Sequence, residues 1–544
     1  MYANNKMLNV FSHPLFKPIY GLSYEEHKRL TTERFKYVTL HGSFKADDMF
    51  DNPNIYIDSS DLIHMYDISL AIKMGVHFTL FCSAVIKLGT EKHRYLIDGA
   101  NECSIKGGFA MTEYRGGSNI KNTKTTAVFN PESRTFTINT PSHADQKYWI
   151  GDVANDGTHV CVFARLIMDN VDHGVHVFIV QIRDKNGIKK NIHLDDCGPK
   201  GGLNGVDNGS IIFDNVVIPY DNLLDKYTYI DDNNIYKTVF TSENNKLNKY
   251  SELLIGGRMV LGSGVVKASL VSLLIAIRYA KERKQFGENG DDTIPIIQYK
   301  SHQMRIVPRL VTTLLLNGFT KYVRERYVDD TMAKNMKYRT QMLITGLKVI
   351  GGWEGLTTFQ VCRESTGGHG YSSYNKIVEY RKDIDIFTTF EGDNNVLLQT
   401  IVRYLIKRFM TKSRIVKGIY NVIANQFIDN VLIELKAQEM KDLTNLVWKL
   451  KMAKNQYNEW NNNLNMIKRI AMRYLYRCIL KYGGKYVSEN EKYYFGLLLT
   501  KRYYLWNIAS EELERLNSMI LDNFDEKELY IPDIFLNVPI LSRL

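Results

Sequence analysis

The chain has 544 residues, a net charge of +11 at pH 7 and a hydrophobic fraction of 44%. This composition is globular and excludes a chain dominated by disorder. At about 100–200 residues per domain, the length excludes a single small module and predicts three or four domains. The basic residues are spread along the chain and are not clustered with aromatic residues on one face, so we expect no nucleic-acid binding.

The six cysteines lie far apart with no C-x-x-C pair, which disfavours a disulfide framework and a zinc ribbon. No paired metal-ligand spacing is present either, so we expect no catalytic metal. The N-terminal stretch lacks the apolar core of a secretory signal. The most apolar stretch, 265–277, contains Lys267 and is far short of the ~18 residues that a membrane span needs. We therefore expect a soluble, intracellular protein with no membrane span.

The first half of the chain changes from a helical to a β pattern. Residues 1–105 are expected to form a helical N-terminal domain, because Ser23 followed by Glu26 is typical of a capped helix start and apolar residues recur at helical spacing in 61–88. The next region, 106–225, is expected to be a small β-barrel or sandwich domain with turns at 172–174 and 184–187. Its predicted strands are 125–129, 135–138, 159–168, 175–182 and 210–218.

Long apolar-periodic segments follow once the strand signal stops at Pro219. They cover 253–281, 296–326, 331–364 and 388–409. Four helices of this length with short joints predict an antiparallel bundle over 245–410. Residues 413–541 also have a helical pattern, which predicts an additional C-terminal helical domain. The expected fold class is α+β, mainly α.

The usual phosphate-binding motifs are absent, so P-loop, kinase and Rossmann functions lose their main support. Several other segments are dense in glycine and polar residues where an ordinary core would not place them. They are GGFAMTE with GGSN (107–113 and 116–119), WIG (149–151), GPKGGLNGVDNG (198–209), RKQFG (283–287), and GGHGY with FEGDN (367–371 and 390–394).

These segments, in this order on a helical, β, helical chain, resemble an acyl-CoA oxidase of the acyl-CoA dehydrogenase and oxidase superfamily. The similarity runs from about residue 13 to about residue 408, and GPKGGLNGVDNG and TTFEGDNNVLLQ resemble the oxidase branch more than the dehydrogenases. The resemblance implies an acyl-CoA dehydrogenase-like fold. It also implies FAD, bound between the β domain and the bundle and partly by the second subunit of a homodimer.

The resemblance assigns roles to residues that match the family's motifs. Glu391 is similar to the catalytic base, which removes an α-proton from the acyl thioester. Burial would raise the pKa of this carboxyl group and make it a better base. The thioester carbonyl would be polarised by the backbone N–H of Glu391 and a flavin ribityl hydroxyl. The implied flavin-binding residues are Thr112, Trp149 and Gly151 at the ring, Arg283, Gln285 and Phe286 at the pyrophosphate and adenine end, and Gly367, Gly368 and Gly370 beside the adenosine; Gly117 and Ser118 are implied to contact the acyl-CoA.

Some of these residues also have a purely structural interpretation. Arg283 alone is typical of a cation at a helix C-terminus, and Glu391 also suits the start of a helix; both roles can coexist with the chemical ones. Glu113 and His369 are expected to be structural. The family often has Asp where this chain has Asn119. Gly201 replaces a bulkier apolar residue found in many relatives.

The resemblance thus implies oxidation of saturated acyl-CoA to trans-2-enoyl-CoA with reduction of dioxygen to hydrogen peroxide, the first step of peroxisomal β-oxidation. The final tripeptide, Ser542, Arg543 and Leu544, is a close variant of the S-K-L address, so we expect a peroxisomal location and recognition by the import receptor. Two alternatives stay open: a dehydrogenase that passes electrons to a carrier flavoprotein, and a non-catalytic relative that acts as a scaffold.

Overall fold

The computed structural model describes residues 5–411, 427–500, 510–529 and 531–532. The protein is mostly helical (60%) and contains a half-barrel of strands, which confirms the predicted fold class. The chain divides into two compact units, Tyr2–Gly257 and Arg258–Leu544. The finer division into four domains stays a prediction.

Helices open the first unit. The predicted start of the second of them is confirmed: the Ser23 hydroxyl accepts a hydrogen bond from the Glu26 amide, and the Glu26 carboxylate accepts one from the Ser23 amide at 2.8 Å. These bonds satisfy amides that a helix start otherwise leaves unpaired. The helices are α1 (Asn5–Phe11), α2 (Tyr24–His41), α3 (Asp48–Asp51), α4 (Pro53–Tyr66), α5 (Ile68–Met74), α6 (Ser83–Leu88) and α7 (Arg94–Asn101), with a π-helical turn (Gly75–Cys82) joining α5 to α6.

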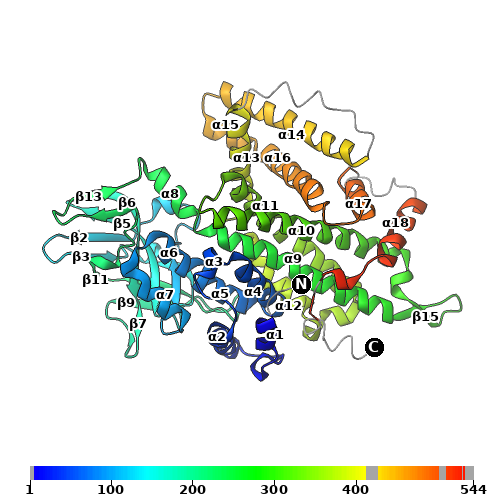
Figure 1. Cartoon of the computed structure of the whole chain (residues 1–544), viewed down its shortest axis with the longest axis horizontal. Coiled ribbons are helices and arrows are strands. Elements are labelled where there is room, and N and C mark those ends of the chain that lie inside the picture. Colours follow the sequence, from blue (N-terminus) through cyan, green and yellow to red (C-terminus); the bar gives the residue numbers. More distant parts are fainter. Residues whose placement is uncertain (1–4, 412–426, 501–509, 530, 533–544) are drawn as a thin grey trace. The chain divides into compact units, whose positions relative to one another are not determined.

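A β region follows these helices in the first unit, and a short helix, α8 (Glu243–Ser251), comes after it (Figure 1). Its larger sheet has the strand order β1-β5-β2-β3-β11, with β6 paired to β5, and a second sheet has the order β4-β10-β9. The rings of Phe136, Phe178 and Phe213 lie in the core that these strands share. The strands are β1 (Gly107–Ala110), β2 (Thr126–Asn130), β3 (Thr135–Asn139), β4 (Lys147–Gly151), β5 (His159–Met168), β6 (Val171–Gln181), β7 (Arg183–Asp184), β8 (Gly187–Ile188), β9 (Ile192–Asp196), β10 (Asn208–Phe213), β11 (Val216–Pro219), β12 (Thr228–Ile230) and β13 (Tyr236–Thr238).

The predicted strands are confirmed to within a few residues, but three details were wrong. The turn expected at 172–174 belongs to β6, and the chain reverses at Asp169 and Asn170, whose φ values of 49° and 61° suit a two-residue hairpin turn. The run 210–218 is broken into β10 and β11 beside Asn215, which has φ 53°. Strands also continue past Pro219, where β12 pairs with β13; three-residue strands are too short for a clear sequence signal.

Long helices build the second unit, and the four predicted ones are present. They are α9 (Leu254–Glu282), α10 (Lys300–Met332), α11 (Tyr338–Ser365) and α13 (Asn394–Thr411), and a shorter helix, α12 (Ile377–Ile384), was not predicted. The helix α11 packs against α10, α12 and α13. A hairpin of β14 (Lys284–Phe286) and β15 (Asp292–Pro295) separates α9 from α10, and Figure 1 shows it projecting beyond the helices of this unit.

The C-terminal helices predicted for 413–541 are confirmed where the structure describes this region. Helix α16 packs against both α14 and α13. The helices are α14 (Phe427–Met452), α15 (Gln456–Asn462), α16 (Leu464–Cys478), α17 (Glu489–Thr500) and α18 (Ser510–Asp522). The tripeptide Ser542–Leu544 lies outside the described residues.

Among the residues that the structure describes, two helical stretches are long and apolar enough to cross a membrane, contrary to the expectation that the apolar stretches are too short. They are Ile68–Leu88 and Glu243–Glu282, and 83% and 100% of their most apolar windows are buried inside the protein. Burial of this kind is typical of core helices, so their composition is weak support for a membrane span.

Candidate active site

Glu391 lies in a turn between a 3₁₀ turn (Asp385–Thr388) and α13. Its φ is 51°, and that of Gly392 is 104°, so two consecutive residues have left-handed backbone. A non-glycine residue in this region is uncommon and tends to occur where the surrounding structure imposes it. Two cations supply that constraint: Arg258 Nε donates to the Glu391 carbonyl oxygen at 2.9 Å, and Lys348 Nζ donates to the Gly392 carbonyl oxygen at 2.7 Å.

The cap of α13 is Asp393 and not Glu391. The Asp393 carboxylate accepts from the backbone amides of Asn395 at 2.9 Å and Val396 at 3.2 Å. An acid two or three residues before such amides is the usual cap geometry. The Glu391 carboxylate is therefore not used for capping, which was the alternative role that the sequence left open.

The Glu391 carboxyl group is buried although the residue as a whole is partly exposed. Its Oε2 atom has no hydrogen-bond partner among the described residues and no contact with solvent. Burial raises the pKa of Glu391 to about 7, while the positive charges of Arg258 and Lys348 act in the opposite direction. A carboxyl group with a pKa close to neutrality can both accept and release a proton at physiological pH.

Thr112 and the strand β4 lie side by side in the first unit. The Thr112 hydroxyl donates to the Tyr148 carbonyl oxygen at 2.7 Å, and the Tyr148 amide donates to the Thr112 carbonyl oxygen at 3.1 Å. This pairing brings Thr112 next to Trp149, a residue that is 57% exposed. Glycine is required at Gly151, because a Cβ there would come within 2.8 Å of the Val76 side chain.

Glu113 has the structural role that the sequence favoured. Its carboxylate accepts from the buried Lys147 ammonium at 3.0 Å, from the Thr125 amide at 2.9 Å and hydroxyl at 2.7 Å, and from the Lys124 amide at 2.8 Å. These partners hold the pKa of Glu113 below its ordinary value although burial opposes them. A carboxylate so fully occupied is unsuited to proton transfer.

The loop that follows Glu113 is open. A Cβ built at Gly117 would meet no atom within 4 Å, and Ser118 and Asn119 are exposed. The loop can therefore contact a ligand without repacking the core.

Two of the other candidate segments are brought together in the second unit. Arg283 directly follows α9, as the helix-end interpretation required, and begins the β14–β15 hairpin. It forms no ion pair with any residue that the structure describes. Gln285 pairs with Ile294 in the hairpin, and Phe286 is 70% exposed.

The glycine-rich 3₁₀ turn (Gly367–Tyr371) contacts the same end of α9, because the His369 and Tyr279 rings lie 5.9 Å apart. Gly370 is required by packing, since a Cβ there would come within 2.0 Å of the Arg363 carbonyl oxygen. At Gly367 and Gly368, by contrast, a Cβ would meet nothing within 4 Å. These two glycines therefore border open space, where a ligand can approach the backbone closely.

Sequence reasoning missed Arg258 and Lys348, which contact the Glu391 turn, and gave no role to Asn394 although it ends the FEGDN segment. Lys348 gave a usable signal, because it is the only charged residue in the apolar stretch ITGLKVIGG (344–352). Arg258 gave none, because its partner lies more than a hundred positions away in the sequence. It also missed a buried cluster in the first unit, where Lys73 Nζ lies 2.6 Å from Asp152 Oδ1 and 2.7 Å from Asp207 Oδ1.

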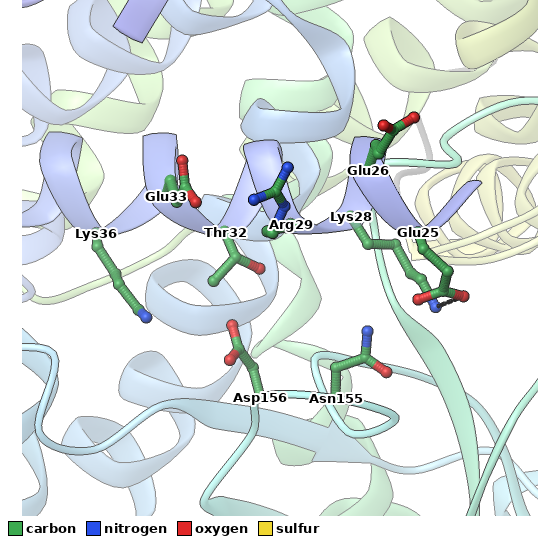
Figure 2. Close-up of a pocket in the computed structure, with 9 residues that line it drawn as sticks. All are labelled: Glu25, Glu26, Lys28, Arg29, Thr32, Glu33, Lys36, Asn155 and Asp156. Atoms are coloured by element: carbon green, nitrogen blue, oxygen red, sulfur yellow. Dashed lines mark ion pairs between the residues drawn. The ribbon is translucent and has the colours of Figure 1, made fainter. Parts of the chain in front are cut away.

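A surface cavity of about 510 Å³ lies between α2 and the loop after β4, and it contains none of these candidate residues. Figure 2 shows Thr32 and Lys36 of α2 pointing toward Asn155 and Asp156. The cavity is lined by both acidic and basic side chains, and Lys28 is already paired with Glu25 at 2.8 Å. The lining favours no single class of ligand. It consists of Glu25, Glu26, Lys28, Arg29, Thr32, Glu33, Lys36, Asn155 and Asp156.

Comparison with known proteins defines the class. A family model described as acyl-CoA oxidase, C-alpha1 domain, matches residues 250–406, and one described as acyl-CoA dehydrogenase, middle domain, matches residues 108–216. Two solved structures are similar in fold: acyl-CoA oxidase 1 from Yarrowia lipolytica, with 24% identity, a TM-score of 0.84, and coverage of 98% of this chain and 87% of that one, and Caenorhabditis elegans acyl-CoA oxidase-2 bound with FAD, ascaroside-CoA and ATP, with 21% identity, a TM-score of 0.82, and coverage of 98% and 87%. The protein thus has the acyl-CoA dehydrogenase-like fold.

Curated relatives include proteins with a higher sequence identity to this chain than these two solved structures have. The peroxisomal acyl-coenzyme A oxidase 3 of Arabidopsis thaliana is 36% identical over 72% of this chain and 59% of its own length. The chain belongs to the acyl-CoA oxidase family. It spans about three fifths of the length of curated relatives that it matches.

Proposed function

We propose that this chain is an FAD-dependent acyl-CoA oxidase, which converts saturated acyl-CoA to trans-2-enoyl-CoA with reduction of dioxygen to hydrogen peroxide, as the first step of peroxisomal β-oxidation. The main support is the carboxyl group of Glu391. It is buried, its Oε2 has no partner among the described residues, and its pKa is raised to about 7 by burial. These are the properties expected of a base that takes a proton from carbon.

In this mechanism the Glu391 carboxylate removes the proton from the α-carbon of the thioester. The C–H electron pair becomes part of the new double bond while the β-carbon loses its hydrogen with two electrons. Negative charge develops on the thioester oxygen during this step and needs a hydrogen-bond donor. The backbone N–H of Glu391 suits that role, because it donates to no acceptor among the described residues.

FAD, when bound, would supply the acceptor for the two electrons and hydrogen that leave the β-carbon, and would return them to dioxygen. The residues present fit this group. Arg283 has no acidic partner among the described residues and can donate two parallel hydrogen bonds to a phosphate. Gly367 and Gly368 border open space, as backbone beside an adenosine requires. The full set proposed to hold FAD is Thr112, Trp149, Gly151, Arg283, Gln285, Phe286, Gly367, Gly368 and Gly370, and the acyl-CoA is proposed to contact Gly117 and Ser118.

The proposed assembly and location follow the family. We propose a homodimer, in which the exposed Phe286 and its hairpin reach the flavin of the second subunit. We also propose a peroxisomal location, which the name of the Arabidopsis relative supports. Recognition by the import receptor through Ser542, Arg543 and Leu544 is part of the same proposal.

An anaerobic titration tests the proposed activity. The purified chain should be yellow, acyl-CoA should bleach the flavin absorbance, and air should restore it with one hydrogen peroxide per acyl-CoA. Glu391→Gln should stay yellow and lose the bleaching. Glu354→Gln is the matched control, because Glu354 is a buried carboxylate of the same unit that pairs with Arg309 at 2.8 Å, and it should still bleach.

Three other outcomes refute parts of the proposal. Slow reoxidation without peroxide would indicate a dehydrogenase. A colourless protein that cannot be reconstituted with FAD would indicate a scaffold. Bleaching at the wild-type rate by Glu391→Gln would show that another group is the base.

A further inference from the structure

Lys348 is a buried lysine without an acidic partner at ion-pair distance among the described residues. It lies in the middle of α11 between Leu347 and Val349, and only 2% of it is exposed. Burying an ammonium group is costly unless it is paired or fully hydrogen-bonded. The bonds that Lys348 does form go to the turn that carries Glu391, at 2.7 Å to the Gly392 carbonyl oxygen and 3.0 Å to Asn394 Oδ1.

The contacts of Asn394 strengthen this link. Its side-chain amide donates to the Val349 carbonyl oxygen at 3.2 Å, so α11 and the first residue of α13 are joined by a closed set of bonds. Helix α9 reaches the same place, because a Cβ at Gly262 would come within 2.8 Å of Leu347. Gly262 lies one helical turn after Arg258, which bonds the Glu391 carbonyl oxygen.

We infer that Lys348 is a positioning residue for the proposed base: by holding the Gly392 carbonyl oxygen and Asn394, it fixes the left-handed turn that directs the Glu391 carboxylate and exposes the Glu391 N–H. This inference rests on the proposed function. The turn has two consecutive residues at positive φ, 51° and 104°, and a conformation of this kind persists only where its surroundings impose it. Arg258 holds one carbonyl oxygen of the turn and Lys348 holds the next.

Lys348 also contributes positive charge beside Glu391, although burial lowers the pKa of Lys348 itself to about 7 and so reduces its charged fraction at neutral pH. The charged groups that face this carboxyl group or its turn are Arg258 from α9, Lys348 from α11 and Asp393 from the turn itself. A nearby cation favours the ionised form of a carboxylate. Removing Lys348 would therefore raise the pKa of Glu391. Because the base acts when deprotonated, the acidic limb of the kcat/KM profile would move to higher pH.

The experiment compares Lys348→Met, Lys348→Arg and Lys267→Met in the holoenzyme. Lys267 is the matched control, because it is 9% exposed in the same unit and its ammonium donates to Asn317 Oδ1 at 3.0 Å, away from the Glu391 turn. We expect Lys348→Met to lower kcat about 100-fold with KM within about threefold, as for a misplaced base. Its acidic limb should move up by as much as about one pH unit, while Lys348→Arg, whose guanidinium stays charged, should have a midpoint at or below that of the wild type. Lys267→Met should change neither quantity.

Hydrogen exchange gives a readout that needs no turnover. Amides in 388–396 should exchange faster in Lys348→Met than in Lys267→Met or in the wild type, because the turn has lost one of its two anchors. If Lys348→Met does not fold, Asn394→Ala removes one of the same bonds and should show both effects in the same direction but smaller.

The inference would be overturned if Lys348→Met matched Lys267→Met in kcat, pH midpoint and exchange. Failure of the proposed function is distinguishable from this result, because the wild type itself would then fail to bleach. In that case the exchange of 388–396 still decides whether Lys348 fixes the turn.

Discussion

The buried cluster around Lys73 in the first unit makes a quantitative prediction about stability. Lys73 Nζ lies 2.6 Å from Asp152 Oδ1 and 2.7 Å from Asp207 Oδ1, and the three side chains are 1%, 3% and 2% exposed. The second Asp207 oxygen accepts from the Asn155 amide at 2.9 Å, and the Asp152 amide donates to the Asp207 carbonyl oxygen at 3.0 Å. The cluster thus fastens α5 to the loop that follows Gly151.

Lys73→Met would leave two buried carboxylates without their shared cation. Breaking a buried pair in this way costs about 3–5 kcal/mol. For a unit of this size, about 1 kcal/mol corresponds to 2–4 °C, so we expect the midpoint for thermal unfolding of this unit to fall by about 10 °C. Lys189→Met should change the midpoint by less than about 2 °C, because Lys189 pairs with Asp184 at 3.1 Å on the surface with 43% of its side chain exposed.

The loss should also depend on pH. Burial already raises the pKa of Asp152 above its ordinary value, and the positive charge of Lys73 opposes that effect. Without the cation the folded-state pKa rises further above the unfolded value. The stability associated with the protonated carboxyl group is then lost as pH rises through the folded pKa. The loss in Lys73→Met, measured by calorimetry, should therefore be larger at pH 8.5 than at pH 5.5.

A second variant separates charge from packing. Changing Asp152 and Asp207 to Asn together with Lys73→Met removes these three charges, leaves Asp156, 3.9 Å from Lys73 in the wild type, paired with Lys106 at 3.1 Å, and should recover most of the lost stability. An equal loss at both pH values, with no recovery in the triple variant, would show that the packing of the Lys73 stem and not its charge stabilises this region.

Three further predictions concern the proposed site. The free energy of unfolding of the wild type, measured in urea relative to that of Glu391→Gln, should fall by about 3 kcal/mol between pH 4.5 and 7. The reason is that the pKa of Glu391 rises from 4.5 to about 7 on folding, so the stability linked to its proton is lost as pH increases. A difference that does not change with pH would contradict the burial of this carboxyl group. Gly370→Ala should destabilise the fold by about 3 kcal/mol or more and weaken retention of FAD, because the new Cβ would come within 2.0 Å of the Arg363 carbonyl oxygen. Gly368→Ala is the control and should leave the thermal midpoint within about 2 °C of the wild type, because a Cβ there meets no atom within 4 Å. Arg283→Ala should weaken FAD binding at least about tenfold in ultrafiltration with little change in thermal midpoint, and equal retention of FAD would remove Arg283 from the cofactor site.

The order of the elements could be predicted from the sequence because its signals are local. The capping pair before α2 and the ten-residue strand β5 follow from short-range patterns, and both are present. The turn between β5 and β6 was misplaced because Asp172, His173 and Gly174 have turn-forming side chains inside a strand, where tertiary pairing overrides the local preference. Helix α13 was begun too early because Asp385–Thr388 form a separate 3₁₀ turn, and the helix that Asp393 caps begins only at Asn394.

The proposed site could be predicted only in part, for a related reason. The motifs identified Glu391 but not what fixes it, since Arg258 and Lys348 meet its turn only after α9 and α11 have packed together. A lysine within an apolar helix is compatible with many partners, and its distance from them in the chain removes any fixed spacing. The sequence located the glycines but did not distinguish those that packing requires from those that border open space. Gly151 and Gly370 belong to the first kind, and Gly367 and Gly368 belong to the second.

The packing of α9 against α11 links the strength of the proposed base to its orientation. Burial alone would raise the pKa of Glu391 further, and a base that stays protonated at neutral pH is ineffective; the charges of Arg258 and Lys348 oppose that rise. Neither cation lies within ion-pair distance of the carboxylate, because each donates instead to a carbonyl oxygen of the turn. The same two side chains therefore keep the carboxyl group ionisable, leave its Oε2 free to accept a proton, and fix the backbone from which it projects.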